Sequence, residues 1–153
     1  MAVGEAPKDH PISIARAKEL LAGDLGAVHR DILRRSCAPI YWFGLDSKVP
    51  RILNNGTLTF VRTPQRLLAV TAAHVFRGYE SDHKKTRLRL QVFNMVVYDL
   101  WSKLIDVSDE LDLATISIDD EFIGRIGRDV TPLTSWPPQP PEEGKGIMLA
   151  GYP

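Results

Sequence analysis

The chain has 153 residues, of which 44% are hydrophobic and 25% are charged, a composition that is ordinary for a globular protein. Its formal net charge is zero, so no overall electrostatic field attracts nucleic acid or an anionic membrane. Cys37 is the only cysteine, which excludes an intrachain disulfide, and no apolar run approaches the roughly 20 residues of a membrane-spanning helix.

The first 36 residues predict a helical extension. The residues before position 12 are polar and lack the basic start and long apolar core of a signal peptide, so we expect a cytoplasmic protein. Apolar residues at helical spacing predict one helix over 12–21 and a second over 25–35, with Gly23 ending the first pattern.

From residue 37 onward the pattern changes to short strands separated by turn-forming residues. The expected strands are 40–44, 57–61, 66–71, 88–92, 95–107 with a bend near Trp101, and 113–118. The segment 78–85 is predicted to be a loop. Because no crossover helix is predicted between 37 and 119, and because six strands can close without a bare edge, we expect an all-β fold: an antiparallel six-stranded β-barrel over 37–120.

The C-terminal part predicts a linker and one further strand. A proline-rich run over 136–141 is typical of a stiff, extended connector, so 121–145 is assigned as a linker. Apolar residues at 147–150 then predict a strand within 146–153.

His74 is the first candidate functional residue. It follows a buried strand and a tight corner of small residues, Thr71-Ala72-Ala73, so a rigid scaffold would hold it while its ring reaches a cleft. A general base needs that placement, because its geometry must be fixed before its pKa matters. A histidine at the end of a strand can also be an ordinary surface or core residue.

Asp112 is the second candidate. Strand alternation puts it on the same side as Ala114, Ile116 and Ile118, which predicts a carboxylate that points into the core. A buried carboxylate is costly unless it is hydrogen-bonded, and an imidazole N–H is a suitable partner. We therefore expect His74 and Asp112 to form a buried pair. The alternative is that Asp112 ends a turn and faces water.

These two stretches resemble the motifs of trypsin/chymotrypsin-like serine proteases. Thr-Ala-Ala-His at 71–74 resembles the histidine motif, and Asp-Leu-Ala at 112–114 resembles the aspartate motif, in the same order. The resemblance covers roughly 40–153. It implies two six-stranded β-barrels, of which this chain has the first and the opening strand of a truncated second. It also implies that His74 is the general base and then the general acid, and that Asp112 orients it.

The sequence departs from that family in one respect that matters for activity. It has no Gly-x-Ser-Gly motif, so the nucleophile and the oxyanion hole of the family are missing from the 153 residues. The serines that lack this glycine setting include Ser81, Ser102, Ser108, Ser117 and Ser135. A base without a nucleophile cannot form an acyl-enzyme, so we expect this chain alone to be inactive. No cofactor and no metal ion are predicted.

Three function classes are consistent with the sequence. The first is a serine endopeptidase domain, which would act on polypeptides when completed by a second barrel. The second is a non-catalytic binding or scaffold module with a protease-like fold. The third is a nucleic-acid-binding barrel that uses Lys84, Lys85, Arg87 and Arg89. This basic run lacks interleaved aromatic residues, so nucleic acid is not an expected partner. No membrane partner is expected either, and substrate preference and oligomeric state are not predicted.

Overall fold

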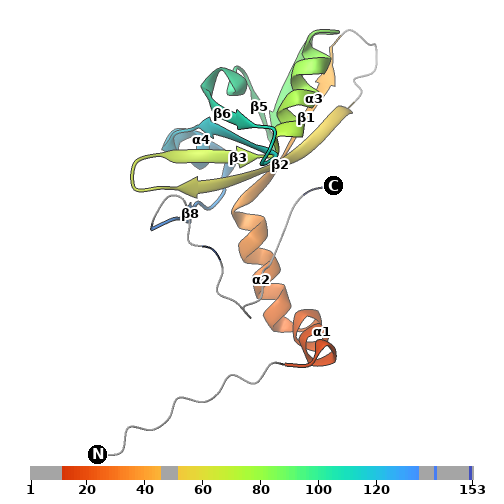
Figure 1. Cartoon of the computed structure of the whole chain (residues 1–153), viewed down its shortest axis with the longest axis vertical. Coiled ribbons are helices and arrows are strands. Elements are labelled where there is room, and N and C mark those ends of the chain that lie inside the picture. The colour runs from red at the N-terminus through yellow and green to blue at the C-terminus, as the bar shows by residue number, and fades with distance from the viewer. Residues whose placement is uncertain (1–11, 46–51, 135–139, 141–151, 153) are drawn as a thin grey trace, which may run out of the picture. The chain divides into compact units, whose positions relative to one another are not determined.

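The computed structural model describes residues 12–45, 52–134, 140 and 152. The chain divides into two compact units, 1–32 and 33–153, and the two N-terminal helices begin in the first of them. Helix α1 spans Ile14–Ala22 and helix α2 spans Asp24–Arg35, so both predicted helices are confirmed (Figure 1). No helix among the described residues combines the length and the apolar character that crossing a bilayer requires.

The second unit is built on one sheet. Its strands in the described part of the chain are β1 (Cys37–Gly44), β2 (Ile52–Arg62), β3 (Leu67–Thr71), β4 (Leu88–Val92), β5 (Met95–Val97), β6 (Leu104–Ser108), β7 (Leu113–Ser117) and β8 (Thr131–Pro132). Seven strands follow the order β5-β4-β1-β2-β3-β7-β6, and all neighbouring pairs on this path are antiparallel. Strand β8 pairs in parallel with the end of β2, beyond the part that β1 covers.

One face of the sheet carries the hydrophobic core. Every second residue of β1 is buried there, namely Ala38, Ile40 and Trp42, because side chains alternate between the faces of a strand. Phe60 on β2 and Ile116 on β7 are also fully buried, and they belong to the same apolar cluster. Ile116 and Ile118, which alternation predicted to face inward, belong to this core, and Ala114 on the same side is also buried.

The predicted closed barrel is wrong. The strand path ends at β5 on one side and at β6 on the other, so the sheet is open, and the fold is mixed α/β rather than all-β. The expected bent strand over 95–107 is interrupted by Asp99, whose φ is +58°, and by the short 3₁₀-helix η1 (Leu100–Lys103). Leu100 is buried by this turn, so the segment packs a side chain instead of extending a strand that could close the barrel.

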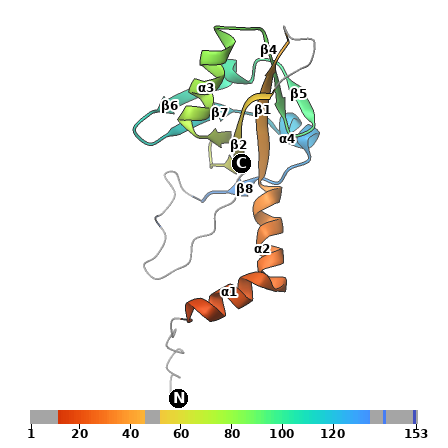
Figure 2. The same ribbon diagram turned by 90° about the vertical axis from the view of Figure 1, so that its right-hand side faces the viewer.

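Two helices occupy positions where the sequence predicted none. Helix α3 spans Ala73–His83 and replaces the loop expected over 78–85, and helix α4 spans Asp120–Ile126 at the start of the expected linker. In the turned view the two helices lie apart from each other on the sheet unit (Figure 2). Helical spacing of Val75, Phe76 and Tyr79 was the available signal for α3, and Gly78 inside it weakened that signal.

Apart from the barrel, the predicted division of the chain, with a helical extension over 1–36, a linker over 121–145 and a further strand within 146–153, stays a prediction. The apolar residues 147–150 of the expected strand, and residues 136–139 and 141 of the proline-rich run 136–141, lie outside the described residues.

Candidate active site

His74 lies on the first turn of α3, three residues after β3 ends at Thr71. Strand β3 is held between β2 and β7, and its residues Leu67–Ala69 are buried, so the strand that precedes His74 is firmly anchored. Ala73 and Val75 are buried on either side of it, whereas the side chain of His74 is 74% exposed. The backbone of His74 is therefore fixed while its ring stays accessible.

The position of α3 is set by contacts with β1 and β2. The indole of Trp42 packs edge-on against Tyr79 at 5.7 Å between ring centroids, and its Nε1 donates a hydrogen bond to Oδ2 of Asp82 at 3.0 Å. On β2, Gly56 lies so close to Val75 that a Cβ there would be 2.6 Å from a Val75 methyl carbon. The absence of a side chain at Gly56 therefore lets the first turn of α3 approach the sheet.

Asp112 stands immediately before β7 and has a left-handed backbone, with φ at +48°. Aspartate tolerates this conformation better than most residues do, and such strained positions concentrate at functional sites. Its carboxylate reaches His74 twice. Oδ1 accepts the backbone N–H of His74 at 2.9 Å, and Oδ2 lies 2.7 Å from the ring Nδ1. The structure thus brings the two predicted residues together.

The two bonds have different consequences. Helix α3 begins after Ala72, which provides no side-chain cap, so Asp112 takes that role from a turn that is distant in the sequence. The negative carboxylate also suits the positive N-terminal end of the helix. The second bond favours the tautomer with the proton on Nδ1, which leaves Nε2 unprotonated. An unprotonated and accessible Nε2 is the atom that a general base uses.

The predicted burial of Asp112 is wrong. Its side chain is 52% exposed, because the left-handed residue ends a turn and directs the carboxylate toward the helix instead of the core. The alternation of inward and outward side chains starts only at Leu113, where β7 begins, so it does not apply to Asp112. The contact with His74 was predicted, but the pair lies in water at the surface, where an ion pair contributes little to stability.

The pKa of the Asp112 carboxyl is lowered, first by the backbone N–H of His74 and then by its ring. A lowered folded-state pKa contributes stability above the ordinary aspartate range, and that stability is lost as the pH falls below about 4. We expect His74→Ala, which keeps the backbone N–H, to raise the pKa of Asp112 only part of the way to its ordinary value. Carboxyl ¹³C NMR titration measures this, and a return to the full ordinary value would contradict the capping bond.

Arg77 and Asp109 are positioning residues that the sequence did not reveal. The guanidinium of Arg77 on α3 donates two hydrogen bonds to Asp109, from Nε at 3.2 Å and from Nη2 at 3.1 Å. These bonds raise the pKa of Arg77 further. Asp109 in turn accepts the backbone N–H of Asp112 on its carbonyl at 3.4 Å. The clamp therefore ties the turn that carries Asp112 to the helix that carries His74.

We expect Arg77→Ala to loosen this turn. Without the clamp, the backbone amides of Leu111 and Asp112 should exchange with solvent faster, and Arg77→Lys should give an intermediate rate because an ammonium lacks the planar fork. Arg89→Ala, which removes a positive charge at an exposed site on β4, is the matched control. Equal exchange rates at the two amides in wild type and Arg77→Ala would show that the clamp does not order the turn.

A cavity of about 500 Å³ adjoins His74. It is lined by the start of α3, by the middle of β2, by the end of β3, and by Tyr152, whose backbone N–H donates to Oγ1 of Thr57 at 2.7 Å. No serine or cysteine is among the described residues that line it. Burial raises the pKa of the Cys37 thiol, which disfavours the nucleophilic thiolate.

The other features that the sequence analysis considered form no catalytic or metal site within the described residues. No group of three or more metal-ligating side chains that could hold an ion occurs in the described ranges. Ser81, Ser102, Ser108 and Ser117 lie on α3, η1, β6 and β7 and outside the cavity beside His74, while Ser135 lies outside the described residues. In the basic run, Lys85 is paired with Asp82 at 3.4 Å.

No protein-family model matches the chain, and no curated protein matches it at a significant level.

Proposed function

We propose that His74 and Asp112 are the general base and its orienting carboxylate in a trypsin-like serine endopeptidase site, of which this chain supplies one half. The observation that carries the proposal is the 2.7 Å contact between Nδ1 of His74 and Oδ2 of Asp112, with the rest of the ring accessible. The proposal rests on this site and on the two sequence motifs, and it does not require a closed barrel.

In this mechanism Nε2 of His74 removes the proton from an attacking hydroxyl and later returns it to the leaving amine. Asp112 stabilises the imidazolium that forms between these steps. Its other oxygen, Oδ1, accepts the backbone N–H of His74 and so keeps the histidine in position. The cavity beside His74 has no serine or cysteine in its described lining, so the nucleophile comes from a polypeptide segment outside that lining. The bonds that the completed endopeptidase site would hydrolyse are peptide bonds.

The test has two arms. The 153-residue chain alone should not be labelled by a fluorophosphonate probe, because labelling requires an activated serine. The coding DNA beyond codon 153 is then read, and the full gene product is expressed if the frame continues into a Gly-x-Ser-Gly motif. In that product we expect probe labelling and peptidase activity, with His74→Ala lowering kcat by roughly 10²–10⁴-fold.

A second candidate function is a non-catalytic binding module. The lack of serine and cysteine in the described lining of the cavity beside His74 favours it. A frame that stops at codon 153, together with no hydrolysis by the chain, would support this candidate and contradict the endopeptidase. An active full product in which His74→Ala leaves kcat unchanged would contradict the role of the dyad.

A further inference from the structure

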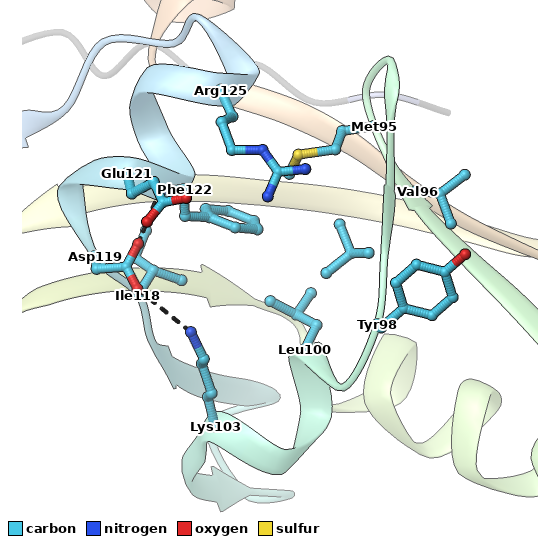
Figure 3. Close-up of a pocket in the computed structure, with 11 residues that line it drawn as sticks. Met95, Val96, Tyr98, Leu100, Lys103, Ile118, Asp119, Glu121, Phe122 and Arg125 are labelled. Atoms are coloured by element: carbon cyan, nitrogen blue, oxygen red, sulfur yellow. Dashed lines mark hydrogen bonds and ion pairs between the residues drawn. The ribbon is translucent and has the colours of Figure 1, made fainter.

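A separate cavity lies where the strand path ends at β5. It has a volume of about 310 Å³ and is formed by β5, η1 and the first turns of α4 (Figure 3). It shares no lining residue with the cavity beside His74. A volume at the low end of the range for ligand pockets suits one or two apolar side chains better than a cofactor.

The floor of this cavity is apolar. Leu100 is 2% exposed and Ile118 is 8% exposed, and the half-buried ring of Phe122 lies beside them. Figure 3 shows Phe122, Leu100 and Ile118 directed toward the same space. Apolar side chains that enter from outside would therefore be removed from water on several sides at once.

Strand β5 provides a free edge beside the cavity. It pairs with β4 on one side only, through Leu90, Gln91 and Val92, and no other described strand pairs with it. Residues of an antiparallel strand alternately direct their backbone groups toward and away from the partner strand. At least one residue of Met95–Val97 therefore offers both N–H and C=O to an incoming strand. A free edge next to an apolar pocket is the geometry of peptide recognition by strand addition.

The charges around the cavity indicate the character of the peptide. Lys103 is already paired with Asp119 at 3.4 Å. Arg125 has no ion pair among the described residues, and Figure 3 shows its guanidinium over the pocket, near Phe122 and Met95. Glu121 lies beside Asp119, away from the guanidinium. An unpaired guanidinium above an apolar floor selects a carboxylate attached to an apolar chain.

We propose that β5 and this cavity bind an extended acidic peptide of a partner protein. The peptide pairs with β5 as an added strand, inserts one apolar side chain between Leu100 and Phe122, and places an acidic side chain two residues along on Arg125. Spacing of two follows because alternate residues of a strand lie on the same face. This interaction is independent of the proposed dyad.

The test uses a capped six-residue peptide in which threonines alternate with leucine and glutamate, titrated into the ¹⁵N-labelled chain. We expect amide shift changes confined to 95–98, 100–103 and 118–125. Replacing glutamate by glutamine in the peptide, or Arg125→Gln in the protein, should weaken binding roughly tenfold or more. Lys103→Gln, which removes a cation already paired, is the matched control and should weaken binding about twofold at most.

Two further probes separate strand pairing from other modes of binding. A peptide methylated at those alternate backbone nitrogens that face β5 keeps its side chains but cannot pair with β5, so its binding should be lost. Octanoate carries the same carboxylate and apolar chain without a peptide backbone, and it should bind more weakly than the peptide. Undiminished binding of the methylated peptide, equal binding of octanoate, or no shift changes at β5 would each overturn the proposal.

Discussion

Trp42→Ala is expected to reduce the free energy of unfolding by about 3–5 kcal/mol, which is the usual cost of truncating a buried tryptophan. The Trp42 side chain is fully buried, and its loss removes both the edge-on contact with Tyr79 and the hydrogen bond to Asp82. Because these contacts hold α3 against β1, the orientation of His74 should be lost as well. Urea unfolding followed by circular dichroism measures the change.

Trp42→Phe is the matched control. It keeps an aromatic ring in the core and removes the hydrogen bond to Asp82, so we expect a much smaller loss, on the order of 1–2 kcal/mol. Equal losses for Trp42→Ala and Trp42→Phe would show that the hydrogen bond, and not the packing of the ring, holds α3.

Gly56→Ala is the second large effect. The new Cβ would lie 2.6 Å and 2.7 Å from the two methyl carbons of Val75, so either the Val75 side chain or one of the two elements, β2 and α3, must move. Overpacking of this kind typically costs about 1–3 kcal/mol. It would also displace the first turn of α3 and lengthen the hydrogen bond between the His74 backbone and Asp112.

A double-mutant cycle isolates this contact. Val75→Ala makes room for the new methyl group, so Gly56→Ala should cost less in the Val75→Ala background than in wild type, by about 1 kcal/mol or more. Strictly additive effects of the two substitutions would contradict the close approach of Gly56 and Val75.

The sequence predicted elements where its local signal was strong. Strand β4 spans 88–92 as expected, because alternate residues there are apolar and polar. The strand before His74 and the strand after Asp112 were also found. Helix α3 was missed because its apolar residues are few and Gly78 interrupts it.

Other features depend on contacts between distant segments. Alternation shows which face of a strand is buried, but it does not determine whether β5 and β6 pair, so the open sheet could not be predicted. The exposure of Asp112 follows from a left-handed backbone that alternation does not encode. The clamp between Arg77 and Asp109 joins residues 32 positions apart, and neither has a local signature.

The most direct test of the dyad is the tautomer of His74, read from the ¹⁵N shifts of its imidazole at a pH where the ring is neutral. The structure predicts a proton on Nδ1, bonded to Asp112, and an unprotonated Nε2. In Asp112→Ala this preference should disappear. A neutral ring in wild type that carries its proton on Nε2, or that shows the same mixture of tautomers as Asp112→Ala, would contradict the assignment of His74 as an oriented general base.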